Sequence, residues 1–486
     1  MNPTRILKKQ VTGQTCRPDR FRSPVSRIYA NAYVNGMQED SDFVESIQYI
    51  TDPLKLKTLS LSSNPDIQLA SIRQIRKLLS DSFDILKNDK FIESGIIPVL
   101  VKYLKHKNSN VVFEATWALT NLASGTSEQT QAVVDSGAIP LLIDLLESDN
   151  SEIVNQAIWA LSNIVGDENA DFREQCIKLG IIPKLLKFID ASDSPTDLIR
   201  NVAGTMVNLC RPKIPPISIQ NVQKILQGFE KLINHHDATV VSDSLWGIDY
   251  IIEPGEDDNE AKVQLILKNK IFVKRIIKLL NHPESEIQSP AIRIIGNIIY
   301  GTNLQTQEIL DFGILTNIKE LLHSSDDIYA IKDILWALSN ILKGPIEHVN
   351  AVFDAGLFST ILEYSYDEEI RIENELILCI KNAAEHPKYV EIMINMGFIQ
   401  SLSEILKNVH GSDVVHEENI LINVLTALQK FTIVGNKKDV LKEIQNSGGA
   451  HFIAKLQKHE NEEIQHLAKS YFGKFFLLYE TLFLVK

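Results

Sequence analysis

The sequence repeats itself at intervals of about 42 residues, and this period constrains the fold more than any other feature. The clearest copies are residues 93–101, 135–143 and 178–186, which read ESGIIPVLV, DSGAIPLLI and KLGIIPKLL. Their glycines are 42 and 43 residues apart, and weaker copies around residues 313, 356 and 397 keep spacings of 43 and 41. Units of this length cannot bury a hydrophobic face alone, so they predict a stacked array rather than separate globular domains.

Each repeat has the pattern of several helices. The glycine is suited to end one helix in the left-handed conformation, and the proline that follows is tolerated in the first turn of the next. Leu and Ile then recur at helical spacing, and a polar break leads to a longer helix, expected over about 153–165 in one copy. Strand patterns are essentially absent. We therefore predict an all-α fold, a right-handed superhelical armadillo-repeat solenoid with about ten repeats over residues 45–486.

The composition excludes several other classes. With 44% apolar and 23% charged residues the chain resembles an ordinary globular protein, and no run reaches the roughly 20 apolar residues of a membrane helix. The N-terminus lacks a secretory apolar stretch. No phosphate-binding glycine loop, nucleophile motif or metal-ligand spacing is found, so we expect no enzyme activity, cofactor or metal. The scattered cysteines are expected to be buried and reduced; they are Cys16, Cys176, Cys210 and Cys379.

Charge is distributed unevenly along the chain. Residues 1–30 carry a charge of +6, which leaves −19 for residues 31–486, since the net charge of the chain is −13. An acidic body does not suit direct nucleic-acid binding, which needs cations to neutralise phosphates. It suits basic ligands, and the basic arm, residues 1–40, is expected to be drawn to the same surface through Lys8 and Lys9. A solvated tail without function is the alternative for this arm.

The longer helix of several repeats carries a tryptophan with an asparagine four residues later. On a helical wheel Ala115, Leu119 and Leu122 form the buried stripe, and Trp117 and Asn121 lie opposite. The same arrangement holds in two more copies, Trp159 with Asn163 and Trp336 with Asn340. We call these positions the Trp/Asn ladder and expect it to be exposed, where it would bind a ligand.

The chemistry of the ladder predicts an extended peptide rich in Lys and Arg. Asn can donate to and accept from a peptide backbone, and neighbouring indole faces accommodate aliphatic stems with cationic ends. Carboxylates recur three residues before the tryptophan position and are expected on the same face; they are Glu114, Asp243, Asp333 and Glu375.

These residues resemble the importin-α (karyopherin-α) family over about residues 45–475. The most specific stretch is 114–130, EATWALTNLASGTSEQT, followed by WALSNIVGD at 159–167, DSLWGIDY at 243–250 and KDILWALSN at 332–340. The resemblance implies a nuclear import adaptor that binds nuclear-localisation-signal cargo and links it to an importin-β carrier through the arm. It also implies shuttling between cytoplasm and nucleus and an export receptor at the C-terminal repeats.

The resemblance implies two cargo sites. In the first, Asp167 would pair with the critical lysine, and the other residues implied are Glu114, Trp117, Asn121, Gly125, Thr130, Trp159, Asn163, Asn201, Asn208, Asp243 and Trp246. In the second they are Asn297, Thr306, Asp333, Trp336, Asn340, Glu375 and Asn382, and Arg293 would interrupt the ladder between the sites.

The sequence departs from the family pattern at several points. Gly204 and Leu378 stand where tryptophans are expected, and the arm has only one lysine pair among isolated arginines. The alternative function is an armadillo scaffold or signalling adaptor of the β-catenin kind. Such adaptors typically present basic surfaces to acidic peptides, which the carboxylates beside this ladder do not favour.

Overall fold

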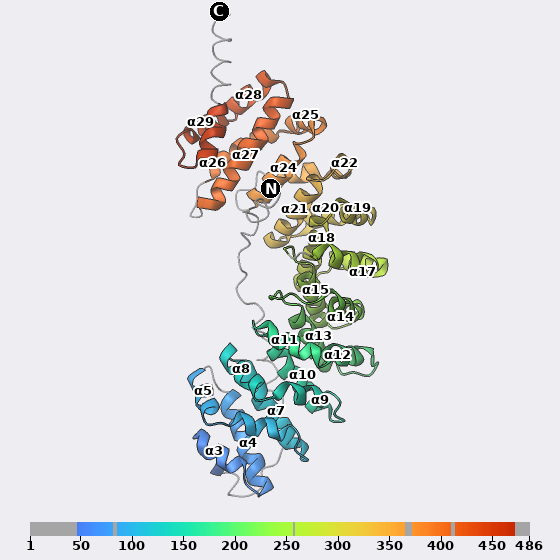
Figure 1. Cartoon of the computed structure of the whole chain (residues 1–486). Coiled ribbons are helices and arrows are strands. Elements are labelled where there is room, and N and C mark those ends of the chain that lie inside the picture. Colours follow the sequence, from blue (N-terminus) through green and yellow to red (C-terminus); the bar gives the residue numbers. More distant parts are fainter. Residues whose placement is uncertain (1–45, 81–84, 256–257, 365–371, 410–413, 472–486) are drawn as a thin grey trace, which may run out of the picture. The chain divides into compact units, whose positions relative to one another are not determined.

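The computed structural model describes residues 46–80, 85–255, 258–364, 372–409 and 414–471, and these are helices joined by turns and loops without any strand (Figure 1). The chain divides into two compact units, Met1–Val99 and Leu100–Lys486. The expected all-α repeat fold is confirmed. Cys16, the arm with Lys8 and Lys9, and residues 472–486 lie outside the described residues.

The first unit holds the start of the repeat array. Asp52 caps α3 (Pro53–Ser60) by accepting a hydrogen bond from the Lys55 backbone N–H at 3.0 Å. The Lys57 ammonium donates to the Ser94 carbonyl at 2.7 Å and so joins α3 to the residue that follows α5 (Ile85–Glu93). The helices are α3 (Pro53–Ser60), α4 (Pro65–Ser80) and α5 (Ile85–Glu93), and α6 (Ile97–Tyr103) crosses the boundary between the units.

The second unit repeats a pattern of three helices. The first helices are α8 (Ser127–Asp135), α11 (Ala170–Lys178), α16 (Asn259–Leu267), α19 (Asn303–Asp311), α22 (Ile346–Asp354), α25 (Pro387–Met396) and α28 (Lys437–Asn446). The second helices are α9 (Ala138–Leu145), α12 (Ile181–Asp190), α14 (Ile219–Leu232), α17 (Lys270–Leu279), α20 (Ile314–Ser324), α23 (Leu357–Tyr364), α26 (Phe398–Asn408) and α29 (Gly449–Leu456). The third helices are α7 (Ser109–Ala123), α10 (Ser151–Gly166), α13 (Thr196–Cys210), α15 (Ala238–Ile251), α18 (Ser285–Tyr300), α21 (Ile328–Leu342), α24 (Glu373–Ala383) and α27 (Val414–Val434), and residues 462–471 are helical as well.

Local sequence signals set these boundaries. Gly137 and Gly180 have positive φ values in the left-handed region, where an ordinary side chain is strained, and each separates a first helix from a second. The third helices begin at side-chain caps: the Asn150 oxygen accepts from the backbone N–H groups of Glu152 and Ile153. The helix predicted over 153–165 is α10, which is slightly longer at both ends.

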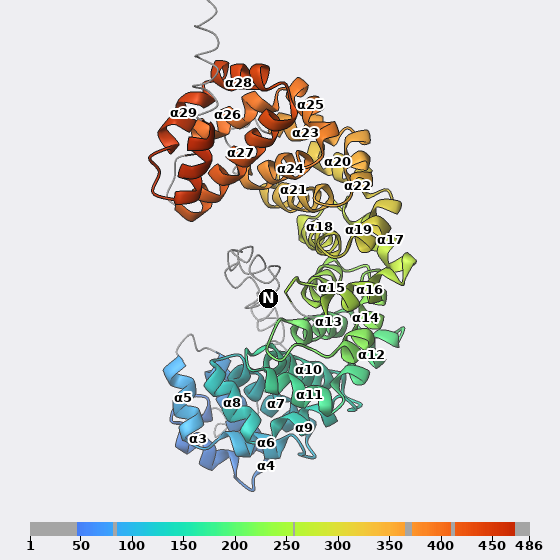
Figure 2. The same ribbon diagram turned by 45° about the horizontal axis from the view of Figure 1, so that its top comes forward.

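The third helices form the inner stack of the second unit. Each packs against the next in the order α7, α10, α13, α15, α18, α21, α24 and α27, as Figure 2 shows. Ala115, Leu119 and Leu122 are fully buried, as are the equivalent residues of α10, so the predicted apolar stripe is confirmed. Cys176, Cys210 and Cys379 are buried free thiols, as expected.

One repeat lacks its first helix. Residues 211–218 form an irregular connection between α13 and α14, and the fully buried Arg173 of α11 holds it by donating to the carbonyl oxygens of Arg211 and Pro215. Lys213 in this connection donates from its ammonium to the Val165 carbonyl at 2.6 Å. Hydrogen bonds from the cationic side chains of Arg173 and Lys213 therefore hold this connection against the preceding repeat, where other repeats have a first helix.

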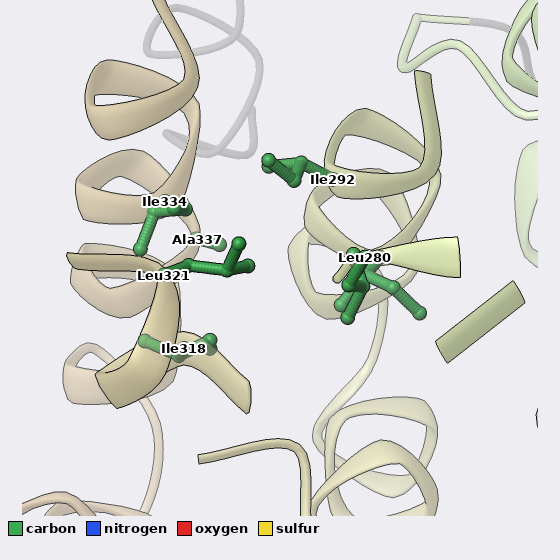
Figure 3. Close-up of a pocket in the computed structure, with 7 residues that line it drawn as sticks. Leu280, Ile292, Ile318, Leu321, Ile334 and Ala337 are labelled. Atoms are coloured by element: carbon green, nitrogen blue, oxygen red, sulfur yellow. The ribbon is translucent and has the colours of Figure 1, made fainter. Parts of the chain in front are cut away.

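The repeats pack closely where α17, α18, α20 and α21 meet. A cavity of only about 10 Å³ lies there, lined by Leu280, Ile292, Ile295, Ile318, Leu321, Ile334 and Ala337 (Figure 3). A space of this size with no polar lining does not suit even one water molecule. Among the described residues, no helix is long and apolar enough to cross a membrane.

Candidate functional site

The Trp/Asn ladder lies on the third helices, entirely within the second unit. Each of these helices packs on the next (Figure 2), so equivalent positions recur from one repeat to the next. The tryptophan position holds, in chain order, Trp117, Trp159, Gly204, Trp246, Arg293, Trp336 and Leu378. The position four residues later holds Asn121, Asn163, Asn208, Tyr250, Asn297, Asn340 and Asn382.

The tryptophans are less exposed than we expected. Trp159, Trp246 and Trp336 are partly exposed, but Trp117 is only 8% exposed, so the expectation of an open indole there is wrong. The Phe113 ring, one turn earlier on α7, meets Trp117 edge to face at 5.7 Å between ring centroids. Among the described residues, no aromatic ring or cation contacts the Trp159 indole. Trp159 is thus the tryptophan best placed to receive a ligand.

The ladder asparagines also join adjacent repeats. The amide nitrogens of Asn163 and Asn208 donate to the carbonyl oxygens of Thr120 and Ser162 at 3.0 Å, and Asn382 donates to Ser339 at 2.8 Å. Each acceptor immediately precedes the ladder asparagine of the preceding repeat. The side-chain carbonyls, which these bonds do not use, are the groups left to accept from a peptide N–H.

Asp167 caps the end of α10 and lies at the junction of two repeats. Its Oδ1 atom accepts two hydrogen bonds of 2.9 Å, from the Ser127 hydroxyl of α8 and from the Asn169 backbone N–H. The structure therefore brings Asp167 to the start of α8, close in sequence to Gly125 and Thr130, which the family resemblance implies for the same site. Ser127 was missed, because its contact with a residue 40 positions away leaves no local sequence signal.

Two predicted residues near Asp167 shape the turn rather than point at a ligand. A Cβ atom on Gly125 would lie 1.9 Å from Gln129 Oε1, so a larger residue would displace the Gln129 side chain that closes the capping box at the start of α8. Thr130 is 1% exposed and its hydroxyl lies 3.2 Å from the carbonyl oxygens of Ala123 and Thr126. A direct ligand contact by the Thr130 side chain is therefore not supported.

We expect the Ser127→Ala substitution to weaken binding of a lysine-rich peptide by about threefold to tenfold. The hydroxyl holds one oxygen of Asp167, and its loss lets the carboxylate rotate away from the ligand, at a cost of about 1 kcal/mol. Titration of Ser127→Ala, Asp167→Asn and the double variant with one peptide measures the coupling. Additive losses would show that the Ser127 contact does not position Asp167.

The carboxylates before the tryptophan position differ in exposure. Asp243, Asp333 and Glu375 are partly exposed, whereas Glu114 is 6% exposed, so its expected place on a ligand-binding face is wrong. Asn201, which the resemblance implies for the same cargo site as Asp243, donates to the Asn155 side chain at 2.7 Å. Loss of solvent around the half-buried Asp243 raises the pKa of its carboxyl to about 7, and the nearby Asp237 carboxylate acts in the same direction.

This raised pKa predicts a pH-dependent stability. In the folded chain Asp243 holds its proton from pH 3.8, the ordinary pKa value, up to about 7, so stability is lost as pH rises through this window. We expect Asp243→Asn to relieve a cost of about 2–4 kcal/mol at pH 8 and almost none at pH 4. Thermal unfolding midpoints of both proteins at the two pH values test this. Equal midpoint differences at pH 4 and pH 8 would contradict it.

Arg293 interrupts the ladder through contacts within the chain. Its guanidinium lies 3.0 Å from Asp249 Oδ2, and its Cζ atom lies 6.0 Å from the centre of the Trp246 ring. Asn297, which is 2% exposed, donates to the other Asp249 oxygen at 2.8 Å. Asn297 is therefore unavailable to a ligand, contrary to expectation, and Arg293 covers part of Trp246.

The second predicted site is more occluded than the first. Tyr300 stacks on Trp336 at 5.9 Å between ring centroids, and the Thr306 hydroxyl is buried and donates to backbone carbonyls. Asn340 has a buried amide nitrogen without a hydrogen-bond partner among the described residues. Asp333 is close enough to Arg293 to interact with it electrostatically. The predicted ligand contact of Thr306 is not supported, which leaves Asp333, Trp336, Asn340, Glu375 and Asn382.

No group of three or more His, Cys, Asp or Glu residues in the described segments is arranged to hold a metal ion. The ladder presents indole faces, amides and carboxylates. The stacked three-helix repeats that carry it define an armadillo-type protein.

Comparisons with known proteins agree with this class. The Armadillo/beta-catenin-like repeat model matches residues 89–124 and 126–166. Importin subunit alpha-3 of Caenorhabditis elegans is 50% identical over 210 residues, which are 43% of this chain and 40% of that protein. Importin subunit alpha-1b of Oryza sativa subsp. japonica is 30% identical over 422 residues, 84% of this chain and 76% of that protein.

The chain belongs to the importin subunit alpha family. It spans less than two thirds of some of these relatives, as the 40% coverage of the C. elegans protein shows. An engineered protein solved by crystallography has the same fold, with a TM-score of 0.73 at 24% identity over 87% of this chain and 99% of its own.

Proposed function

We propose that this protein is a nuclear import adaptor that binds Lys/Arg-rich signal peptides along the first part of its ladder. The observation that carries the proposal is the arrangement at α10. Trp159 offers an indole without an aromatic or cationic neighbour among the described residues, and the Asn163 carbonyl lies one turn further on. Asp167 follows at the helix end, and Ser127 and Asn169 hold one of its oxygens. The other oxygen makes no hydrogen bond with the described residues, although the Lys213 ammonium is close enough to interact with Asp167 electrostatically, and in this proposal that oxygen pairs with a ligand ammonium.

The bound peptide is extended and basic in this proposal. A lysine pairs with Asp167, its aliphatic stem lies against an indole, and ladder asparagines bind the peptide backbone. The charge of −19 over residues 31–486 favours such a ligand, and association is expected to be faster at low salt. The alternative of an armadillo scaffold for acidic peptides is less favoured, because Asp167 and Asp243 would repel them.

The adaptor role also requires partners. Family membership supports a carrier of the importin-β type bound through the basic arm, an export receptor at the C-terminal repeats, and shuttling between cytoplasm and nucleus. No direct contact with nucleic acid or membrane is part of the proposal.

An import assay in permeabilised cells tests the adaptor role. We expect a fluorescent protein with a lysine-rich signal to accumulate in nuclei only when this chain and an importin-β carrier are both added. A signal with every lysine replaced by glutamine is the cargo control and stays outside, because Asp167 loses its partner. Deleting residues 1–45 removes the basic arm and is expected to abolish accumulation. Accumulation without the chain, or none with it, would contradict the adaptor role.

A further inference from the structure

Gly204 leaves an open space in the ladder. It lies within α13, between the helices that carry Trp159 and Trp246. Only one atom of the described residues outside its own helix, Asp243 Oδ2 at 3.9 Å, lies within 4 Å of where its Cβ would be. The φ of Gly204 is not positive, so the backbone does not require glycine. Glycine inside a helix costs up to about 1 kcal/mol relative to alanine, and no close contact with the described residues requires it here.

An unpaired carboxylate borders this space. Asp243 makes no hydrogen bond or ion pair with the described residues. Arg200, a cation on α13, is already paired with Asp237 through two contacts of 3.1 Å. Loss of solvent raises the pKa of Asp243 to about 7 because it destabilises the ionised carboxylate. A ligand cation beside Asp243 would stabilise that ionised form.

One arginine of the chain already lies between an indole and a carboxylate, which is the arrangement that the space at Gly204 could offer to an arginine of a ligand. Arg293 places its guanidinium over Trp246 and pairs with Asp249. The space at Gly204 offers the same partners to an outside residue, with indoles on the flanking helices and the carboxylate of Asp243. A planar guanidinium can stack and bind a carboxylate through two N–H groups, whereas an ammonium is a compact point charge.

We propose that the space over Gly204 is an arginine-selective subsite, in which the guanidinium of a bound peptide pairs with Asp243 between Trp159 and Trp246. The inference rests on the proposed binding of basic peptides and adds a side-chain preference to it. A tryptophan at this position would leave room for a lysine stem between adjacent indoles, so glycine shifts the preference from lysine toward arginine.

A peptide scan tests the subsite. Each lysine of an oligolysine peptide is replaced in turn by arginine, and affinities are measured by fluorescence anisotropy. We expect one position at which arginine tightens binding about fivefold to tenfold, and citrulline, which is uncharged and similar in shape, to remove the gain. Gly204→Trp and Asp243→Asn should each reduce the arginine preference to less than twofold. Circular dichroism checks folding, and the Asp243→Asn variant alone carries the test if the tryptophan variant does not fold.

Two further variants distinguish the possible failures. Leu378→Trp fills the other vacant tryptophan position and should leave the arginine preference unchanged. Asp167→Asn should weaken every peptide but keep the preference at that position. No arginine preference in the wild type, or the same preference in Gly204→Trp, would overturn the subsite. If oligolysine does not bind at all, or binds independently of Asp167, the proposed function itself fails.

Discussion

The Asp167→Lys substitution is expected to weaken binding of a single-cluster lysine-rich peptide by at least a hundredfold, roughly 3 kcal/mol or more. The variant replaces a charge-assisted hydrogen bond with repulsion between two ammonium groups. It also removes the carboxylate oxygen that accepts from Ser127 and Asn169, so a stability loss of about 1 kcal/mol is expected. Isothermal titration calorimetry measures the first effect and thermal unfolding the second.

Asp171→Lys is the matched control for this charge reversal. Asp171 is exposed on α11, close to Asp167 in the sequence, and the substitution changes the net charge by the same amount. We expect its affinity for the peptide to remain within about threefold of wild type, because exposed charges that do not contact the ligand are screened by salt. Equal losses in both variants would mean that overall charge, and not the Asp167 contact, drives binding.

The double substitution Trp159→Ala with Asn163→Ala is expected to reduce peptide binding below detection. Buried aromatic contacts commonly contribute about 2–4 kcal/mol at interfaces, and the asparagine adds the backbone contact beside them. Part of the stability will also be lost, since the Asn163 amide joins α10 to the Thr120 carbonyl of α7 at 3.0 Å. Calorimetry and circular dichroism on the same samples separate the two effects.

The same pair of substitutions at Trp336 and Asn340 provides the control. These residues lie in the second predicted site, where Tyr300 already covers the indole. The affinity of the Trp336 and Asn340 double variant for a single-cluster peptide, which binds at α10, should be less than threefold below wild type. If the Trp159 and Asn163 variant unfolds, its tryptophan belongs to the core and the ladder interpretation fails. If both variants lose binding equally, the peptide does not select the first site.

The repeat architecture could be predicted because its signals are local. Gly137 and Gly180 mark the turn between helices, and the helical period places Ala115, Leu119 and Leu122 in the core. The register of the ladder followed from the same period, because side chains four residues apart share a helix face. None of these inferences needed contacts between distant residues.

The properties that were not predicted depend on neighbours in other helices or turns. A helical wheel gives the direction of Trp117 but not that packing leaves only 8% of it exposed. It places Asn297 on the ladder face but does not reveal that Asp249 binds its amide. The hydrogen bond from Ser127 to Asp167 and the raised pKa of Asp243 likewise arise from tertiary packing. Sequence reasoning therefore found the face of the ladder but overestimated how many of its residues are available to a ligand.

The most direct test of the proposed function is the charge preference of the ladder surface. A lysine-rich peptide and a glutamate-rich peptide of equal length are titrated by calorimetry into the unmodified chain at low and high salt. We expect that only the lysine-rich peptide binds and that its affinity falls as salt rises, since its charges pair with partly exposed carboxylates. Equal or tighter binding of the glutamate-rich peptide would contradict it.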